Sequence, residues 1–252
     1  MDNHWLYIAL LLLIGTNTQA QLPPLRSLHT NGQHCYALTQ TEEVLLLDTA
    51  GKIERRFAAP AAIPLTSMDF SHRWKVFLFS EETQSVLFLD RFLVLLDRLT
   101  LPEDFGWITL TAPSADQTLW LFAQDRHALV RYDMQRREWR SQSSLSGIIP
   151  AHAHLPDQLS EYQNLLFLNI PESGIFVFDM FGSFREQLPF WASSAWQFLE
   201  QQLCFHDKAS QQMICWDIYR REQESLPVPA ADHILRLPRQ ADQPAFFCLP
   251  KD

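Results

Sequence analysis

The stretch Val86-Leu-Phe-Leu-Asp90 is a short apolar run that ends in aspartate. The same pattern occurs at four more places, Val44-Leu-Leu-Leu-Asp48, Leu129-Val-Arg-Tyr-Asp133, Ile175-Phe-Val-Phe-Asp179 and Met213-Ile-Cys-Trp-Asp217. The five aspartates follow one another at intervals of 38 to 46 residues. A run of four apolar residues between polar turns is typical of a strand that is buried on both faces. The chain is therefore built from repeated units that each contain several strands.

A period of about 40 residues with several strands per unit predicts an all-β fold of the β-propeller type. Each aspartate closes the third strand of its unit, and the second unit illustrates this with strands predicted at Ser85–Leu89 and Val94–Leu101. At the C-terminus, Ile234–Leu237 and Phe246–Leu249 make only half a unit. We expect Pro24–His29 to supply a missing strand, because a closed ring leaves no exposed sheet edge. This gives six blades closed by strands from both termini, with five blades as the alternative.

The fourth unit, Leu168–Phe184, resembles an NHL-type repeat. A polar turn leads into an apolar strand, which is followed by Phe178-Asp-Met-Phe-Gly182 and an outer strand. The first unit, with Leu47-Asp-Thr-Ala-Gly-Lys52, fits this pattern and also that of the quinoprotein-type propeller repeat. The resemblance implies a six-bladed propeller and assigns no site residues. A WD40 repeat is disfavoured, because Trp216-Asp217 is the only Trp-Asp pair in the chain.

The first twenty residues differ from the rest of the chain. Leu6–Ile14 is almost entirely apolar, and Thr18 and Ala20 occupy the −3 and −1 positions of a small-x-small cleavage site. The apolar run is shorter than the roughly 20 residues that cross a bilayer. We therefore expect residues 1–20 to be a signal peptide and residues 21–252 to be one propeller domain. The mature protein would be exported to the periplasm or cell envelope and would have no membrane span.

The chain contains four cysteines, Cys35, Cys204, Cys215 and Cys248. An even number of cysteines behind a signal peptide favours disulfides. The turn centred on Lys208–Gln211 lies midway between Cys204 and Cys215, so these two should face each other on adjacent strands. A second pairing, between Cys35 and Cys248, would join two different blades.

The formal net charge of −9 argues against a nucleic-acid partner, because an acidic surface repels phosphates. The sequence contains no nucleophile elbow, phosphate-binding loop, dinucleotide fingerprint or His-Glu-x-x-His motif. We therefore predict no cofactor and no metal site.

Two sets of acidic residues require an interpretation. The five repeated aspartates could form a metal ring, but aspartate at the start of a turn also accepts backbone N–H bonds, which is the simpler role. The second set occupies the turns between second and third strands and comprises Glu42, Glu43, Glu81, Glu82, Asp125, Glu172 and Asp207. These turns should share one face with the loops that lead into each blade. They could attract a basic partner or a cation, or could simply be polar turn residues.

The longest predicted connection, Ser141–Glu161, contains His152, His154 and Asp157. A His-x-His pair in an extended segment puts both rings on one side, but zinc needs three or four ligands, so free surface histidines are the simpler interpretation. Long connections often carry function, which makes this segment a candidate binding region. Most tryptophans should pack between blades. Trp107 and Trp191 are exceptions, because each lies beside a loop that leads into a blade.

These observations predict a monomeric binding or scaffold module for a protein or peptide partner. The candidate binding residues are His152, His154, Asp157, Trp107, Trp191 and Glu172. The alternative is a lyase or hydrolase that acts on a sugar or lactone at the mouth of the central channel. Such an enzyme would bring several His, Asp, Glu or Arg side chains together at that mouth.

Overall fold

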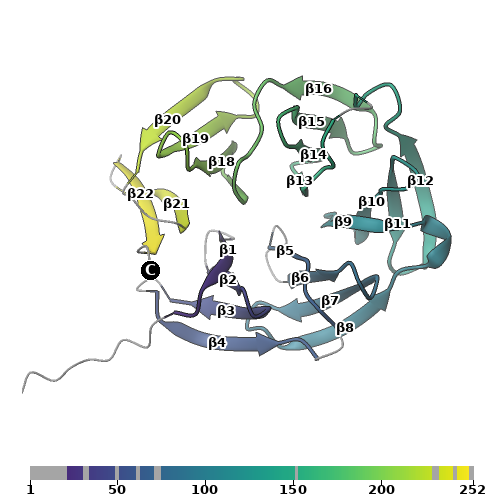
Figure 1. The fold of residues 1–252 in the computed structure, drawn as a ribbon, viewed down its shortest axis with the longest axis horizontal. Helices are drawn as coiled ribbons and strands as arrows, with labels where there is room; N and C mark the ends of the chain where they lie inside the picture. The colour runs from purple at the N-terminus through teal and green to yellow at the C-terminus, as the bar shows by residue number, and fades with distance from the viewer. Residues whose placement is uncertain are drawn as a thin grey trace, which may run out of the picture.

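The computed structural model describes residues 22–30, 34–48, 51–60, 63–70, 75–150, 153–228, 233–240 and 243–249. These residues form antiparallel sheets that are arranged in a ring (Figure 1). Five of the sheets have four strands each and are the blades of a β-propeller, and one further sheet has two strands. The helical content of the described chain is one short 3₁₀ turn, η1 (Glu103–Phe105). The predicted signal peptide and its cleavage site lie outside the described residues.

Each blade runs in chain order from the centre of the ring to its rim (Figure 1). Blade 1 contains β1 (Leu25–Thr30), β2 (Cys35–Thr39), β3 (Glu43–Leu47) and β4 (Ile53–Ala58). Blade 2 contains β5 (Ser67–Asp69), β6 (Lys75–Ser80), β7 (Ser85–Asp90) and β8 (Leu95–Thr100). Blade 3 contains β9 (Ile108–Pro113), β10 (Thr118–Ala123), β11 (Ala128–Asp133) and β12 (Glu138–Ser144). Blade 4 contains β13 (Gln158–Tyr162), β14 (Leu165–Ile170), β15 (Gly174–Asp179) and β16 (Phe184–Leu188). Blade 5 contains β17 (Trp196–Leu199), β18 (Gln202–Asp207), β19 (Gln212–Asp217) and β20 (Gln223–Pro227).

The repeated aspartates stand where the sequence predicts them, at the end of the third strand of every blade or directly after it. Asp90 shows their role. Its Oδ1 accepts the backbone N–H groups of Phe92 and Val94, each at 2.8 Å, and so fixes the turn into β8. The corresponding oxygen of Asp179 accepts two backbone N–H groups in the same way. The aspartates therefore hold the turns.

The five-blade alternative is confirmed, and the arrangement predicted for the N-terminal strand is wrong. The segment expected to complete the last unit forms β1, which pairs with β2 in the first blade, with Thr30 opposite Cys35. In the chain, β2 is the next strand after β1. Forming this local hairpin costs less loop-closure entropy than pairing with a strand about 200 residues away.

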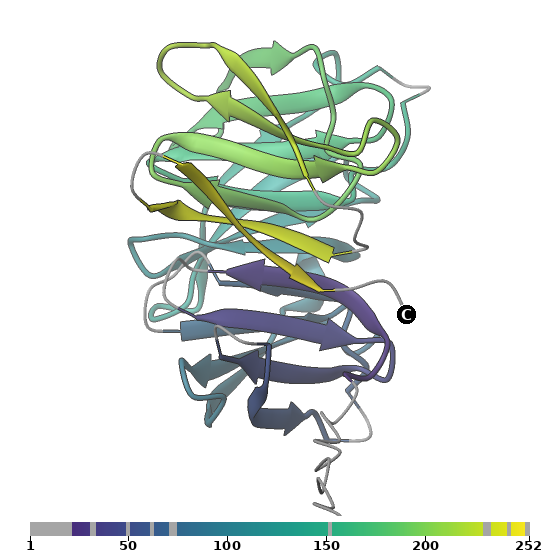
Figure 2. The ribbon, with the colours of Figure 1, turned by 90° about the vertical axis from the view of Figure 1, so that its left-hand side faces the viewer.

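The two-stranded sheet of β21 (His233–Gln240) and β22 (Gln243–Leu249) occupies the gap between blades 5 and 1 (Figure 2). Ile234 packs with Cys204, Met213 and Cys215 of blade 5. The next residue, Leu235, packs with Leu28 and other apolar side chains of blade 1. Successive residues of a strand point to opposite faces, so one strand contacts both neighbouring blades. The C-terminal hairpin therefore closes the ring beside the N-terminal strand.

The predicted disulfide between Cys204 and Cys215 is confirmed. The two residues lie directly opposite each other on β18 and β19, and their sulfur atoms are bonded. Cys35 is a buried free thiol, so the second pairing considered, with Cys248, is not formed. Burial raises the pKa of the Cys35 thiol. No helix long and apolar enough to cross a membrane occurs in the described part of the chain.

Candidate functional site

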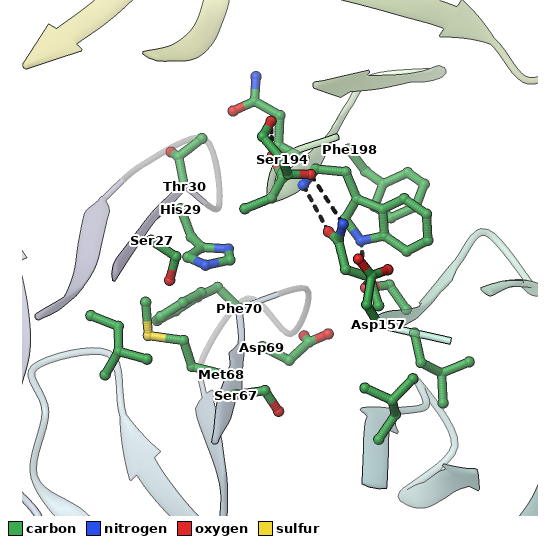
Figure 3. Close-up of a pocket in the computed structure, with 18 of the residues that line it drawn as sticks. Ser27, His29, Thr30, Ser67, Met68, Asp69, Phe70, Asp157, Ser194 and Phe198 are labelled. Atoms are coloured by element: carbon green, nitrogen blue, oxygen red, sulfur yellow. Dashed lines mark hydrogen bonds between the residues drawn. The ribbon is translucent and has the colours of Figure 1, made fainter. Parts of the chain in front are cut away.

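A cavity of about 770 Å³ lies at the centre of the ring. The first strands of the blades, β1, β5, β9, β13 and β17, line it together with the residues that precede β5, β13 and β17 (Figure 3). These strands pack against their blades on one edge only, so their other edge faces the cavity. For this reason β5 is half-buried along its whole length, whereas β7, the third strand of the same blade, is buried at every residue but the last.

The two faces of the ring differ in the loops that they carry. One face carries the connections between blades and the turns between second and third strands, and we call it the connection face. It includes residues 101–107, 145–157 and 189–195 among the connections, and 81–84 and 171–173 among the turns. The opposite face carries the aspartate-capped turns between third and fourth strands.

Asp157 lies directly before β13 and lines the cavity at its connection-face end. Its Oδ1 accepts a hydrogen bond of 2.7 Å from the side-chain amide of Asn169. Asn169 is completely buried and is itself fixed by two hydrogen bonds with the backbone of Ala192. Desolvation by the groups packed around it raises the pKa of the Asp157 carboxyl group, although the residue as a whole stays exposed in the open cavity. The hydrogen bond from Asn169 holds the carboxylate in a fixed place.

Asp69, His29 and Phe70 line the cavity from blades 1 and 2 (Figure 3). The His29 ring packs against the Phe70 ring with a centroid distance of 5.3 Å. Figure 3 shows the Asp69 carboxyl group pointing into the same open space as Asp157. The Arg26 side chain also lines the cavity, and its Nη1 donates a hydrogen bond of 3.0 Å to the Leu65 carbonyl.

Aromatic side chains form another part of the cavity wall. Tyr162 and Phe198 stack at a centroid distance of 4.6 Å, and Trp196 lies 6.0 Å from Phe198. The Trp196 indole N–H donates to the hydroxyl of Ser160 at 3.1 Å, which fixes the ring. Gln158 bridges the backbone of Ser194 and Trp196, and so ties the start of β17 to β13.

The structure distributes the predicted binding residues over the connection face. His154 and Glu172 are brought together, with 3.2 Å between Nε2 and Oε2, and both side chains are more than half exposed. His152 lies outside the described residues. The Trp107 indole N–H donates to Oε1 of Glu81 at 2.9 Å, and its ring is 46% exposed. The Trp191 ring is 37% exposed. Of the five predicted residues that the structure describes, only Asp157 lines the cavity.

The insert predicted at Ser141–Glu161 is shorter than expected. The strand β12 continues to Ser144 and β13 begins at Gln158, so the connection covers residues 145–157. Sequence reasoning did not identify Asp69 and His29 as site residues. His29 lies on β1, a strand that the sequence predicted, whereas Asp69 lies on β5, which contains no continuous apolar run and was not predicted. A polar segment left unassigned before the second strand of the second unit is the pattern that could have revealed Asp69.

The second acidic set mostly serves local structure. Asp125 accepts the backbone N–H of Trp107 at 3.2 Å, and a Cβ at Gly106, whose φ is +80°, would overlap the same carboxylate. Asp207 accepts backbone N–H groups and the Ser210 hydroxyl within its own turn. Among the described residues, no three His, Cys, Asp or Glu side chains are placed to hold a metal ion together.

No protein-family model matches the sequence, and no curated protein matches it by sequence. Solved propeller structures are similar to the fold. A streptogramin B lyase matches with a TM-score of 0.57 at 12% identity, covering 91% of this chain and 84% of that one. A catalytically inactive virginiamycin B lyase from Staphylococcus aureus, solved with quinupristin, gives 0.55 at 13% identity and coverages of 92% and 94%. The Pan2 WD40 domain of Neurospora crassa gives 0.52 at 12% identity and coverages of 84% and 68%. At these identities the likeness extends to the fold alone, and this chain is an all-β protein of the β-propeller fold.

Proposed function

We propose that this protein is a binding module for a protein or peptide partner, and that a segment of the partner enters the central cavity from the connection face. The observation that carries this proposal is the cavity of about 770 Å³, which polar, charged and aromatic side chains line together. Its volume lies within the range of about 300–1,000 Å³ that is usual for ligand sites. Aromatic side chains in partly desolvated pockets are also the groups that contribute most to binding energy at interfaces.

The residues around the mouth would form the rim of the interface. Trp107, Trp191 and the pair of His154 and Glu172 are exposed on the connection face, where they can contact a partner that covers the mouth. We further propose that the protein acts as a monomer in the periplasm or cell envelope. The disulfide between Cys204 and Cys215 supports an exported form, because disulfides persist in oxidising compartments.

Site-specific photo-crosslinking tests this proposal. A benzophenone amino acid is placed either at Leu155, which is 52% exposed in the connection that leads to β13, or at Phe181, which is 68% exposed in a turn on the opposite face. Each variant is then irradiated in a native envelope preparation. We expect one protein adduct from the Leu155 position and none from the Phe181 position. An adduct from Phe181 alone would contradict binding through the connection face.

A second candidate function is catalysis at the channel mouth by a lyase or hydrolase that acts on a sugar or lactone. One observation favours it: His29, Asp69 and Asp157 line the same cavity, and an imidazole with carboxylates can perform general acid–base chemistry. A panel of lactones and glycosides tests this function. It is supported if the purified protein turns over a substrate and His29→Ala abolishes that turnover. An activity that is unchanged in His29→Ala would place the chemistry elsewhere.

A further inference from the structure

The charged groups that line the cavity are unevenly balanced. Among the described residues, three acidic ones, Asp69, Asp157 and Glu200, line it together with one arginine, Arg26. The described part of the cavity wall therefore holds more carboxylate side chains than arginine or lysine side chains. A concave site with low-dielectric walls concentrates the resulting potential, which raises the local concentration of cations. The cavity should accordingly favour a positively charged group.

The depths of the two aspartates favour a long side chain. The inner strand β13 begins at Gln158, so Asp157 lies one position before it. The inner strand β5 begins at Ser67, and Asp69 lies two positions farther along that strand. Three strand positions correspond to about 10 Å along the channel. Asp157 thus stands at the connection-face end and Asp69 stands deeper. A side chain that enters at the mouth must be long to place its charge between them. Arginine and lysine carry their charge at the end of a long stem.

The remaining wall suits such a side chain. The rings of Trp196, Phe198 and Phe70 can contact an alkyl stem, and a cation near an aromatic face is attracted by the negative potential of that face. The hydroxyls of Ser67, Ser160 and Ser194 also line the cavity and can accept hydrogen bonds from N–H donors. A carboxylate ligand, by contrast, would meet like charges at both depths.

Building on the proposed function, we infer that the cavity receives an arginine or lysine side chain of the partner, and that its cationic end lies between Asp157 and Asp69. The desolvation that raises the pKa of Asp157 agrees with this role, because a bound cation would compensate the partly desolvated negative charge.

Calorimetric titration with two peptides tests the inference. The first peptide is acetyl-Gly-Arg-Gly-amide, and the second carries citrulline in place of arginine, which keeps the shape and removes the charge. We expect the arginine peptide to bind and the citrulline peptide to bind at least about tenfold more weakly, because the neutral citrulline side chain cannot form an ion pair with the carboxylates of the cavity. Equal affinity for the two peptides, or binding of neither, would overturn the inference. Agmatine serves as a free small cation. If agmatine binds while the arginine peptide does not, the site takes a small molecule and the inference of a partner side chain is wrong.

Variants locate the site. Asp157→Asn and Asp69→Asn should each weaken binding of the arginine peptide by about tenfold or more. Glu82→Gln is the matched control, because it removes an exposed carboxylate from the same face that does not line the cavity. Equal effects of Glu82→Gln and Asp157→Asn would show a general surface attraction and overturn the inference. If Asp69→Asn fails to fold, Asp157→Asn alone decides, because the amide oxygen that this substitution introduces can still accept the hydrogen bond from Asn169.

The outcomes separate this inference from the proposed function. If Leu155 crosslinks a partner but the arginine peptide does not bind, the inference is wrong and the binding function stands. If the arginine peptide binds but the adduct forms from Phe181, the cation site exists and the proposed face of partner binding is wrong.

Discussion

At the residue scale, aspartate has two different roles in this molecule, and the neighbours of each carboxylate decide which one it has. The backbone N–H of Arg136 and the guanidinium of Arg140 hold the pKa of Asp133 below its ordinary value. Asp133 thereby fixes a turn as a stable anion. Burial has the opposite effect on Asp157, whose pKa is raised although Asn169 donates a hydrogen bond to it. A carboxylate whose charge is poorly compensated in the free protein is suited to bind a cation.

The Asp157→Asn variant tests this difference through the pH dependence of stability. Because the folded-state pKa of Asp157 is raised, the folded protein binds this proton more tightly than the unfolded chain does. The ionised group therefore destabilises the fold at neutral pH, and this penalty is lost as the pH falls through the raised pKa. We expect Asp157→Asn to be more stable than the wild type at pH 7. The difference should disappear below about pH 4, the ordinary value for aspartate.

Urea denaturation at several pH values measures this effect, and Glu172→Gln provides a control carboxylate that is largely exposed. A variant Asp157→Asn that is less stable than the wild type at pH 7 would show that the free protein already compensates the charge of Asp157.

At the element scale, the sequence predicted the third strands of all five blades and three of the five strands that line the cavity, β1, β9 and β17, but it missed β5 and β13. The third strands contain continuous apolar runs, and β3 lies at the residues predicted for it. The inner strand β5 has the sequence Ser-Met-Asp and β13 has Gln-Leu-Ser-Glu-Tyr, so neither contains such a run. An apolar run reports burial, whereas β5, which faces the cavity, is only partly buried.

The candidate site was therefore the part of the molecule that sequence reasoning reached least. Asp157 was identified because it lies in the same long connection as His154. In the structure Asp157 lines the cavity, whereas His154 pairs with Glu172 and does not line it. Asp69 and Phe70 lie on or directly after a strand that the sequence did not predict. Bringing residues from blades 1, 2, 4 and 5 to one cavity depends on ring closure, which no local pattern contains.

The hairpin of β18 and β19 provides a prediction at this scale. The disulfide joins cysteines that are 11 residues apart, and closing a loop of this size stabilises a fold by about 3 kcal/mol in the chain-entropy description. We expect reduction of the protein to lower its urea midpoint accordingly. The double substitution Cys204→Ala and Cys215→Ala should lower the midpoint without reductant and remove the further effect of reductant.

Cys35→Ala is the control, because Cys35 is a buried free thiol in blade 1. If reductant still shifts the midpoint of the double variant, another disulfide contributes to stability.

At the scale of the whole molecule, the ring depends on a hairpin that is smaller than any blade. The sheet of β21 and β22 has two strands, and an isolated two-stranded hairpin is marginally stable in water. It persists here because Ile234 packs on blade 5 and Leu235 packs on blade 1. The sequence predicted this half unit correctly and assigned it the wrong additional strand.

Ring closure can be tested with single truncations on the two sides of β21. Ile234 is 7% exposed and Leu235 is 3% exposed, so both side chains are core residues. We expect Leu235→Ala to lower the free energy of unfolding by about 2–5 kcal/mol, and Ile234→Ala by a similar amount. The exposed residue Leu96 of β8 serves as a control, and Leu96→Ala should have little effect. Differential scanning calorimetry measures all three. A loss confined to one of the two residues would show that the hairpin attaches to one neighbour and leaves the ring open.

The most direct test of the function combines the position of the partner with the chemistry of the cavity. The yield of partner adduct from a benzophenone at Leu155 is measured in the wild type, in Asp157→Asn and in Glu82→Gln. If a cationic side chain of the partner anchors in the cavity, the adduct yield at limiting partner concentration should fall about tenfold in Asp157→Asn and stay unchanged in Glu82→Gln. Equal yields from the wild type and Asp157→Asn would contradict an anchoring role for the cavity.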